Sequence, residues 1–195
     1  MLILVDIDGV ILHAHEGFGA DMREDTQWKG DDALFFDRLF QDHEYLESLA
    51  GKLDFLDVLD RVLSEFDNPC TPTTFMKWWC YDLVKNTELI DWLATAPGNV
   101  VLASNQERTR RDAIVTSLAG LDFYAATYFS CDIGHAKPDP EFFQHILADQ
   151  HVDPEQVWFV DDSPINVESA CCLGLNGVHY QSNSQVIKEL ARAFA

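Results

Sequence analysis

The chain opens with a short apolar run. Residues 2–12 read LILVDIDGVIL, in which two aspartates and a glycine interrupt leucine, isoleucine and valine. A run of this length, rich in β-branched residues and interrupted by a glycine, is typical of a buried strand that ends in a turn. The pattern therefore predicts a first strand here, with Asp6 and Asp8 set among its apolar residues.

Residues 13–96 have a different pattern, in which apolar side chains recur at positions i, i+3 and i+4. This spacing is typical of amphipathic helices that pack their apolar faces together. We therefore expect a group of packed helices between residues 13 and 96. The stripes consist of Leu34, Phe35, Leu39, Phe40, Phe55, Leu56, Leu59, Val62, Leu63, Trp78, Trp79, Leu83 and Leu89 to Leu93.

From residue 99 onward, short apolar runs alternate with helical spacing. Strands are expected at 99–105, 126–134, 157–163 and 176–180, and helices at 107–118, 140–148, 165–173 and 184–194. Strands this apolar are typical of a parallel sheet with helices on both faces. The predicted class is α/β, a doubly wound parallel sheet with a small helical cap inserted after the first strand. The predicted boundaries are 1–12 and 97–195 for the core and 13–96 for the cap.

Polar side chains follow several of these strands. Parallel sheets bind ligands beyond the carboxyl ends of their strands, so these side chains are expected to converge. A hydroxyl and an ammonium group suit a phosphate, and clustered carboxylates suit Mg²⁺, which prefers oxygen ligands. Two carboxylates about 4 Å apart repel by roughly 4 kcal/mol at an effective dielectric of about 20, so a cation, a shared proton or a solvent-filled opening is expected to compensate this repulsion. The converging residues are Asp6, Asp8, Ser104, Asn105, Lys137, Asp161 and Asp162.

The composition of the chain limits the classes of partner and the cellular locations that we expect. The formal net charge of −20 works against binding nucleic acid or an anionic membrane surface. The five cysteines show neither CxxC spacing nor a disulfide framework, which favours a reducing cytoplasm. No apolar run approaches 18 residues and the start lacks a basic segment, so neither a signal peptide nor a membrane span is expected. The seven histidines lack zinc-site spacing. A monomer or homodimer is expected.

Four stretches carry a family resemblance. VDIDGV, LASN, HAKPDPEFF and FVDDSPINVESA lie in this order at predicted strand ends. They resemble the four motifs of the haloacid dehalogenase (HAD) superfamily of phosphohydrolases. The resemblance covers residues 1–12 and roughly 97–180, and implies a Rossmann-like core. The 13–96 insertion stands where this family has a helical cap, and the layout is similar to small sugar-phosphate phosphatases.

The resemblance implies a catalytic role for each matching residue. Asp6 would be the nucleophile that forms an aspartyl-phosphate, and Asp8 the general acid and then the general base. Ser104 and the backbone amide of Asn105 would hold the phosphoryl oxygens. Lys137 would steady Asp6 and the negative charge of the phosphoryl group.

The resemblance also implies a magnesium site. Asp6 and the backbone carbonyl of Asp8 would contact Mg²⁺. Asp162 matches the carboxylate most often found on the metal, whereas Asp161 would bind directly or through water. Mg²⁺ is therefore the expected cofactor.

The resemblance implies phosphate chemistry. In members that cleave carbon–halogen bonds, the position two after the nucleophile is not a carboxylate, and here it is Asp8. We expect a Mg²⁺-dependent phosphatase acting on a small phosphorylated metabolite, with a sugar phosphate favoured. Phosphoglucomutase-like transfer, a receiver-type signalling domain and a non-catalytic module are the alternatives. The long insertion disfavours a receiver, and the intact motifs disfavour a non-catalytic module.

Other residues allow two interpretations. Trp78 and Trp79 are expected in the cap core, although they could stack on a substrate. The arginines after Ser104 are expected to form surface ion pairs, with a phosphate contact from Arg108 as the alternative. His15, Glu16 and Arg23 are expected in a solvated loop, with substrate contact as the alternative. Cys171 and Cys172 are expected to be buried.

Overall fold

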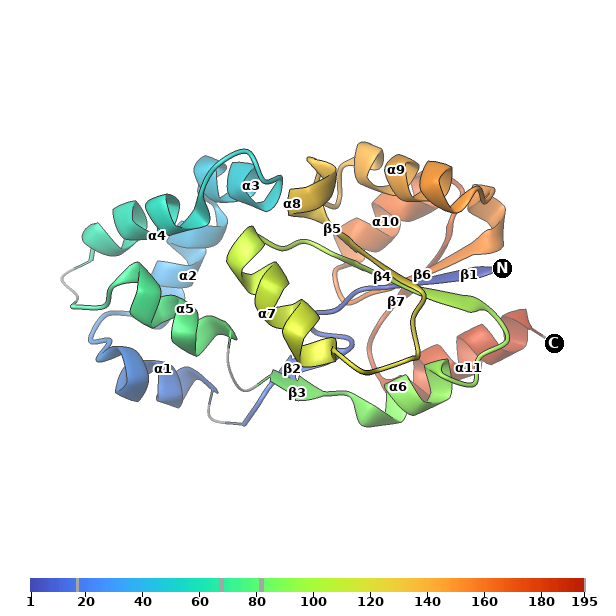
Figure 1. Ribbon diagram of the computed structural model, residues 1–195, viewed down its shortest axis with the longest axis horizontal. Helices are drawn as coiled ribbons and strands as arrows, with labels where there is room; N and C mark the ends of the chain where they lie inside the picture. The colour runs from blue at the N-terminus through green and yellow to red at the C-terminus, as the bar shows by residue number, and fades with distance from the viewer. Residues whose placement is uncertain (17, 67–68, 81–82, 195) are drawn as a thin grey trace.

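The core is a parallel sheet of five strands in the order β5-β4-β1-β6-β7 (Figure 1). The computed structural model describes residues 1–16, 18–66, 69–80 and 83–194. The strands are β1 (Leu2–Val5), β4 (Asn99–Ser104), β5 (Ala126–Phe129), β6 (Val157–Asp161) and β7 (Asn176–His179). β1 lies in the centre and pairs with β4 on one side and β6 on the other. The predicted parallel α/β architecture is confirmed.

Helices cover both faces of this sheet. One face carries α6 (Thr87–Leu93), α7 (Arg108–Leu118) and α11 (Asn183–Ala193), and the other carries α9 (Pro140–Gln150) and α10 (Pro164–Cys172). Successive residues of a strand point to opposite faces. Accordingly, Ile3 and Val5 of β1 join the first cluster, and Leu2 and Leu4 join the second. β1 is thus buried on both sides, as its unbroken apolar run requires.

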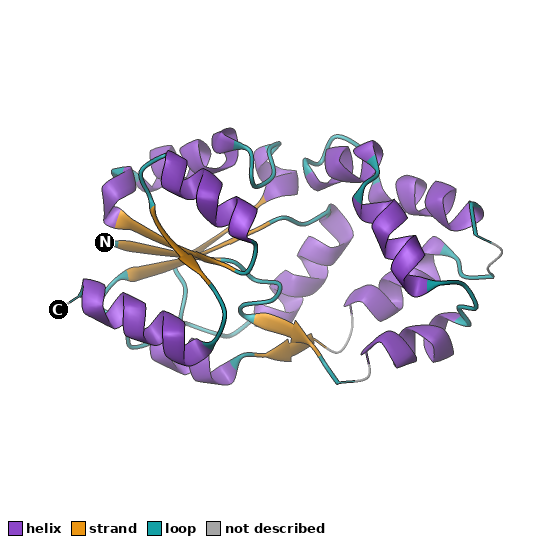
Figure 2. Cartoon of the chain, turned by 180° about the vertical axis from the view of Figure 1, so that it is seen from behind, coloured by secondary structure: helices purple, strands orange, loops and turns teal. Residues whose placement is uncertain are grey.

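The cap consists of helices α1 to α5, which stand beside the sheet (Figures 1 and 2). Their bounds are α1 (Phe18–Thr26), α2 (Asp32–Phe40), α3 (His43–Leu49), α4 (Phe55–Ser64) and α5 (Pro72–Cys80). They enclose an apolar cluster of their own, with Phe35 and Phe75 fully buried in it. Of the predicted apolar stripe on α2, however, Leu34 and Phe40 are exposed.

Aspartates begin three of the cap helices. Asp31, Asp42 and Asp54 accept hydrogen bonds from backbone N–H groups in the first turns of α2, α3 and α4. Asp42 also binds Arg38 of α2 at 2.5 Å and Arg61 of α4 at 2.8 Å. One carboxylate therefore caps α3 and joins it to both neighbouring helices. These pairs keep the pKa of Asp42 well below its ordinary value, although burial alone raises it.

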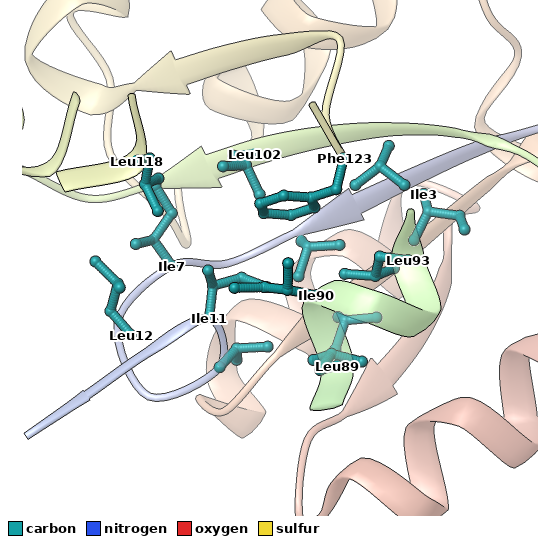
Figure 3. Packing of buried hydrophobic residues seen from close by; sticks show 14 of the residues in the cluster. Ile3, Ile7, Ile11, Leu12, Leu89, Ile90, Leu93, Leu102, Leu118 and Phe123 are labelled. Atoms are coloured by element: carbon teal, nitrogen blue, oxygen red, sulfur yellow. The ribbon is translucent and has the colours of Figure 1, made fainter. Parts of the chain in front are cut away.

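A small two-stranded sheet connects cap and core. β2 (Leu12–Ala14) pairs antiparallel with β3 (Leu83–Lys85), and α6 follows directly. Leu89, Ile90 and Leu93 of α6 lie with Ile3 of β1 in the core cluster (Figure 3). Residues 83–96 thus pack with the sheet, although the sequence groups them with the cap. For the domain boundaries we accordingly propose a core of 1–14 and 83–195.

Asn86 fixes this two-stranded sheet to the core. Its side chain caps α6, donates to the carbonyl of Val10 at 2.8 Å and bonds Asn183 of α11 at 2.7 Å. Its backbone N–H donates to the carbonyl of Ile11. The two-stranded sheet is therefore anchored on the face of the five-stranded sheet that carries α11.

Several predicted elements differ from the observed ones. The strand expected over 126–134 ends at Phe129, and α8 (Ser130–Ile133) follows before Gly134. A short 3₁₀ helix, η1 (Pro154–Gln156), precedes β6. Cys171 and Cys172 are exposed, so the prediction of burial was wrong. Both lie in the last turn of α10, whose buried position is Ala170. Within the described part of the chain, none of the helices has the length and apolar character that a membrane crossing requires.

Candidate active site

The carboxyl ends of β1, β4 and β6 bring the predicted polar residues together. Val5, the last residue of β1, pairs with Leu102 and Val160, and β4 and β6 continue only two residues and one residue further. Asp6 continues β1 by donating its backbone N–H to Val160 at 2.8 Å, and its side chain accepts from the N–H of Ile7. The Asp6 carboxylate is therefore held at the centre of this edge.

Lys137 lies between two carboxylates. It comes from the loop between α8 and α9, and its side chain is 1% exposed. Its Nζ lies 2.9 Å from Asp6 and 2.7 Å from Asp161, and donates to the carbonyl of Ala103 at 2.9 Å. All three donor positions of the ammonium are thus used inside the protein.

Burial and charge have opposite effects on these groups. Burial raises the pKa of Asp6 to about 7, and the nearby charges of Asp161 and Asp8 add to this, while Lys137 opposes it. For Lys137, burial favours the neutral amine, but Asp6 and Asp161 together outweigh burial and raise its pKa. The ammonium therefore stays charged at neutral pH, and Asp6 needs further positive charge to be fully ionised there.

Asp161 and Asp162 are adjacent but have different surroundings. Asp161 is fully buried, pairs with Lys137 and accepts from the N–H of Ser163 and the amide of Asn166. Asp162 is exposed as a whole residue, but its carboxyl group is partly buried. This burial is the main cause that raises the pKa of Asp162, and repulsion from Asp161 raises it further. Asp161 is thus committed to protein donors, whereas Asp162 is the more available carboxylate.

Three carboxylates can hold a metal ion. One oxygen each from Asp6, Asp161 and Asp162 lies within 4.8 Å of the others. Carboxylate oxygens are the donors that Mg²⁺ prefers, and a site with only a few of them leaves room for water ligands. Gly9 closes the loop beside this group with φ +77°, where an added Cβ would lie 2.1 Å from Asp162. The residues present therefore fit Mg²⁺.

The Asp8 side chain points to different partners. Arg110 of α7 contacts both of its oxygens, with Nη2 at 2.8 Å from Oδ1 and Nε at 3.3 Å from Oδ2. Gln106 donates to the second oxygen at 2.7 Å. Asp8 is not part of the group of carboxylates that can hold a metal, so its predicted metal contact through the backbone carbonyl stays a prediction.

Ser104 and Asn105 follow β4. Ser104 is buried, and its hydroxyl receives a hydrogen bond from Gln106 at 3.0 Å. The Asn105 side chain donates to the carbonyl of Lys137 at 2.7 Å and accepts from its N–H at 2.8 Å. Asn105 therefore fixes the loop that carries Lys137, a role that its position in the motif did not indicate.

Sequence reasoning missed Gln106 and Arg110. Gln106 joins Ser104 to Asp8, and Arg110 is buried against Asp8, so the expectation of a surface ion pair is wrong for Arg110. A signal was present, because cations are unfavourable in the first turn of a helix, where α7 carries three arginines. The other two differ: Arg111 pairs with Asp132, and Arg108 donates to the carbonyl of Gly51 in the cap.

Cap and core enclose two cavities beside Asp8. The smaller, of about 40 Å³, lies between Asp8, Asn105 and Gln106 of the core and Tyr45 and Trp79 of the cap. The larger, of about 320 Å³, is also lined by Asp8, Trp79 and Arg110, and reaches His13 of β2 and Leu83 of β3. Asp8 thus faces both spaces.

Comparison with known families decides the identity of this fold. The model of the haloacid dehalogenase-like hydrolases matches residues 1–174. The chain belongs to this family. The HAD-like resemblance and the helical cap after the first strand are thereby confirmed, and the chain is a HAD-like hydrolase.

Solved structures show the same HAD-like fold. A predicted HAD-like hydrolase from Porphyromonas gingivalis has a TM-score of 0.77 at 22% identity, covering 99% of this chain and 97% of that chain. A HAD family enzyme from Bacteroides thetaiotaomicron, in complex with magnesium and inorganic phosphate, has a TM-score of 0.73 at 22% identity, with 92% and 93% covered.

Curated relatives match only part of this HAD-like chain. D-ribitol-5-phosphate phosphatase from Bacteroides thetaiotaomicron is 33% identical over 69 residues, which is 35% of this chain and 34% of that protein. Flavin mononucleotide hydrolase 1 from Arabidopsis thaliana is 35% identical over 65 residues, which is 33% of this chain and 26% of that protein. The matches thus span about a quarter to a third of these relatives.

The remaining residues of interest have local partners. His15 pairs with Asp21, and Arg23 pairs with Asp32. Glu16 is exposed, and the carbonyl of Glu16 lies 2.9 Å from the His15 ring. Of the two tryptophans, Trp78 is buried in the cap cluster.

Trp79 has neighbours on its ring. Phe75 stacks on it at 5.3 Å, and the Arg110 guanidinium lies 5.4 Å from its centre. Trp79 is nevertheless half-buried and lines both cavities beside Asp8, so stacking of a substrate on it stays a prediction.

Proposed function

We propose that this protein is a Mg²⁺-dependent phosphatase that hydrolyses a small phosphorylated metabolite through an aspartyl-phosphate on Asp6. The observation that carries the proposal is the arrangement at Asp6. One of its oxygens is paired with a buried ammonium, and the carboxylate belongs to a group of three that fits a divalent cation. A nucleophilic carboxylate held beside fixed positive charge is what phosphoryl transfer needs.

In the first step, an Asp6 oxygen attacks phosphorus and the bond from phosphorus to the leaving oxygen breaks. Lys137 places a fixed positive charge 2.9 Å from the Asp6 carboxylate. Mg²⁺ held by Asp6, Asp162 and Asp161 would neutralise negative charge on the phosphoryl oxygens. The Ser104 hydroxyl and the Asn105 backbone N–H, which follow β4, would bind two of those oxygens.

Asp8 moves the protons. In the first step it gives the leaving oxygen the proton that it took from water in the preceding turnover, which leaves a neutral alcohol. It then takes a proton from the water that attacks phosphorus, and the bond from phosphorus to Asp6 breaks. Its place between the two cavities supports this role, because the leaving oxygen must lie between the phosphoryl group and the rest of the substrate.

A sugar or polyol phosphate is the favoured substrate. The 320 Å³ cavity lies at the lower end of the usual range for small-molecule sites. One partial relative is a D-ribitol-5-phosphate phosphatase, which supports the same class. The other is a flavin mononucleotide hydrolase, so flavin mononucleotide belongs in the test.

The test is phosphate release from a panel of phosphorylated metabolites. Wild type is assayed with Mg²⁺ and with EDTA, beside Asp6→Asn. Release that needs Mg²⁺, favours a few related compounds and is lost in the variant supports the proposal. Isomerisation of a sugar phosphate without release would point to a mutase instead, and no turnover of any kind would count against an enzyme of this class.

A further inference from the structure

Arg110 is a buried cation shared by the core and the cap. Its side chain is 9% exposed. Nε and Nη2 bind the two oxygens of Asp8, and Nη1 donates to the backbone carbonyl of Trp79 in the last turn of α5. The guanidinium plane also lies 5.4 Å from the Trp79 ring. One rigid group thus contacts the predicted proton donor and a cap helix at the same time.

A charge in this position is costly unless it is fully paired. A guanidinium offers five N–H donors in a fixed plane, which can match a carboxylate on one edge and a carbonyl on the other. Lysine could not replace it, because an ammonium is a point charge without this planar geometry. The planar guanidinium therefore gives these contacts a fixed direction as well as a charge.

We propose that Arg110 is a positioning residue that sets the orientation of the Asp8 carboxylate when the cap is docked on the core. This inference rests on the proposed role of Asp8 as general acid. Gln106 completes the arrangement, because it donates to the same carboxylate and to the Ser104 hydroxyl. Docking of Trp79 fixes Arg110, and Arg110 in turn fixes Asp8 between the two cavities beside it.

Two substrates separate positioning from a merely structural role. A sugar or polyol phosphate leaves as an alkoxide and needs a proton from Asp8, whereas p-nitrophenyl phosphate leaves as a stable phenolate and does not. General acid catalysis typically contributes about 100-fold or more, and misplacement by about 1 Å can cost about 100-fold. Because kcat/KM reports the steps up to formation of the aspartyl-phosphate, it excludes the later step in which Asp8 acts on water for both substrates. Arg110→Met should therefore lower kcat/KM for the alkyl phosphate about 10- to 100-fold more than kcat/KM for p-nitrophenyl phosphate.

Arg111→Met is the matched control. Arg111 lies on the same helix and pairs with Asp112 and Asp132, both in the core. Arg111→Met should change kcat/KM by the same factor for both substrates. Arg110→Lys should resemble Arg110→Met, because charge without the planar fork does not restore the geometry. Equal losses on both substrates in Arg110→Met would overturn the inference.

Asp8→Asn distinguishes this inference from the proposed function. If Asp8→Asn lowers kcat/KM for the alkyl phosphate selectively and Arg110→Met does not, Asp8 is the acid and Arg110 does not position it. If Asp8→Asn shows no selectivity, the role proposed for Asp8 fails and the inference fails with it.

A second measurement needs no turnover. Amide hydrogen exchange of the 195-residue chain reports whether α5 is held by Arg110. Loss of one hydrogen bond to a charged group should speed exchange in the last turn of α5 about 10-fold in Arg110→Met. Exchange there that equals both wild type and Arg111→Met would show that Arg110 does not couple the cap to Asp8.

Discussion

Removal of the buried ammonium tests the electrostatic account of the site. In Lys137→Met, Asp6 and Asp161 lose a partner at 2.9 Å and 2.7 Å. At an effective dielectric of about 20, each attraction is roughly 6 kcal/mol, but the variant also no longer buries an ammonium. Removing one member of a buried ion pair usually costs roughly 3 to 5 kcal/mol. We expect the free energy of unfolding in EDTA at pH 8 to fall by about that amount.

The loss should depend on pH and on Mg²⁺. Asp6 already has a pKa of about 7, far above its ordinary value of 3.8. Folding therefore favours the protonated carboxyl, and this contribution to stability is present below about pH 4 and is lost as the pH rises through 7. Without Lys137 the pKa of Asp6 rises further, so the penalty of the variant should be smaller at pH 5 than at pH 8. Mg²⁺ should reduce it at pH 8.

Urea denaturation followed by circular dichroism measures these differences. Lys52→Met is the control, because Lys52 is exposed and pairs only with Glu47 among the described residues. An exposed pair of this kind contributes about 1 kcal/mol or less. A Lys137→Met variant that is as stable as Lys52→Met in EDTA at pH 8 would refute the argument that the ammonium compensates the two carboxylates.

Three further predictions concern the metal group and the cap. Asp162→Ala should raise the Mg²⁺ concentration needed for half-maximal activity more than Asp161→Ala does, whereas Asp161→Ala should lower stability more; the reverse order in a Mg²⁺ titration and a melt would contradict the assignment. Gly9→Ala should weaken Mg²⁺ binding, measured by calorimetry, because the added Cβ would displace Asp162 and strain a residue at φ +77°; unchanged affinity would exclude this effect. Asp42→Ala should lower the free energy of unfolding by about 1 to 2 kcal/mol through loss of a helix cap. Because the pKa of Asp42 is lowered in the folded protein, this contribution is present above about pH 4 and shrinks as the pH falls, so a difference from wild type that grows toward pH 3 would be contrary.

The sheet and its catalytic edge were predictable for a physical reason. Strands such as 99–105 are apolar on both faces, which only a covered parallel sheet accommodates. The polar residues at their ends then had to meet, and Asp6, Lys137 and Asp161 do so within hydrogen-bond distance. The two-stranded sheet of β2 and β3 was missed because strands of three residues are too short to show a period.

Side-chain direction was less predictable than position. The sequence placed Asp8 beside the metal group, but its carboxylate binds Arg110, a residue 102 positions away in the chain. Likewise, Asn105 binds the backbone of Lys137. Such choices depend on how α7 and the cap dock on the sheet, which local spacing does not encode.

The most direct test of the central claim is to trap the phosphoryl group. Wild type is mixed with Mg²⁺ and a phosphate ester that it hydrolyses, and the mixture is quenched in acid within milliseconds. The protein is then digested with pepsin and analysed by mass spectrometry. The account predicts one phosphoryl group on Asp6, absent from Asp6→Asn, which should also release no phosphate while keeping its fold. Phosphate release by Asp6→Asn at the wild-type rate, or phosphorylation of a different residue, would contradict it.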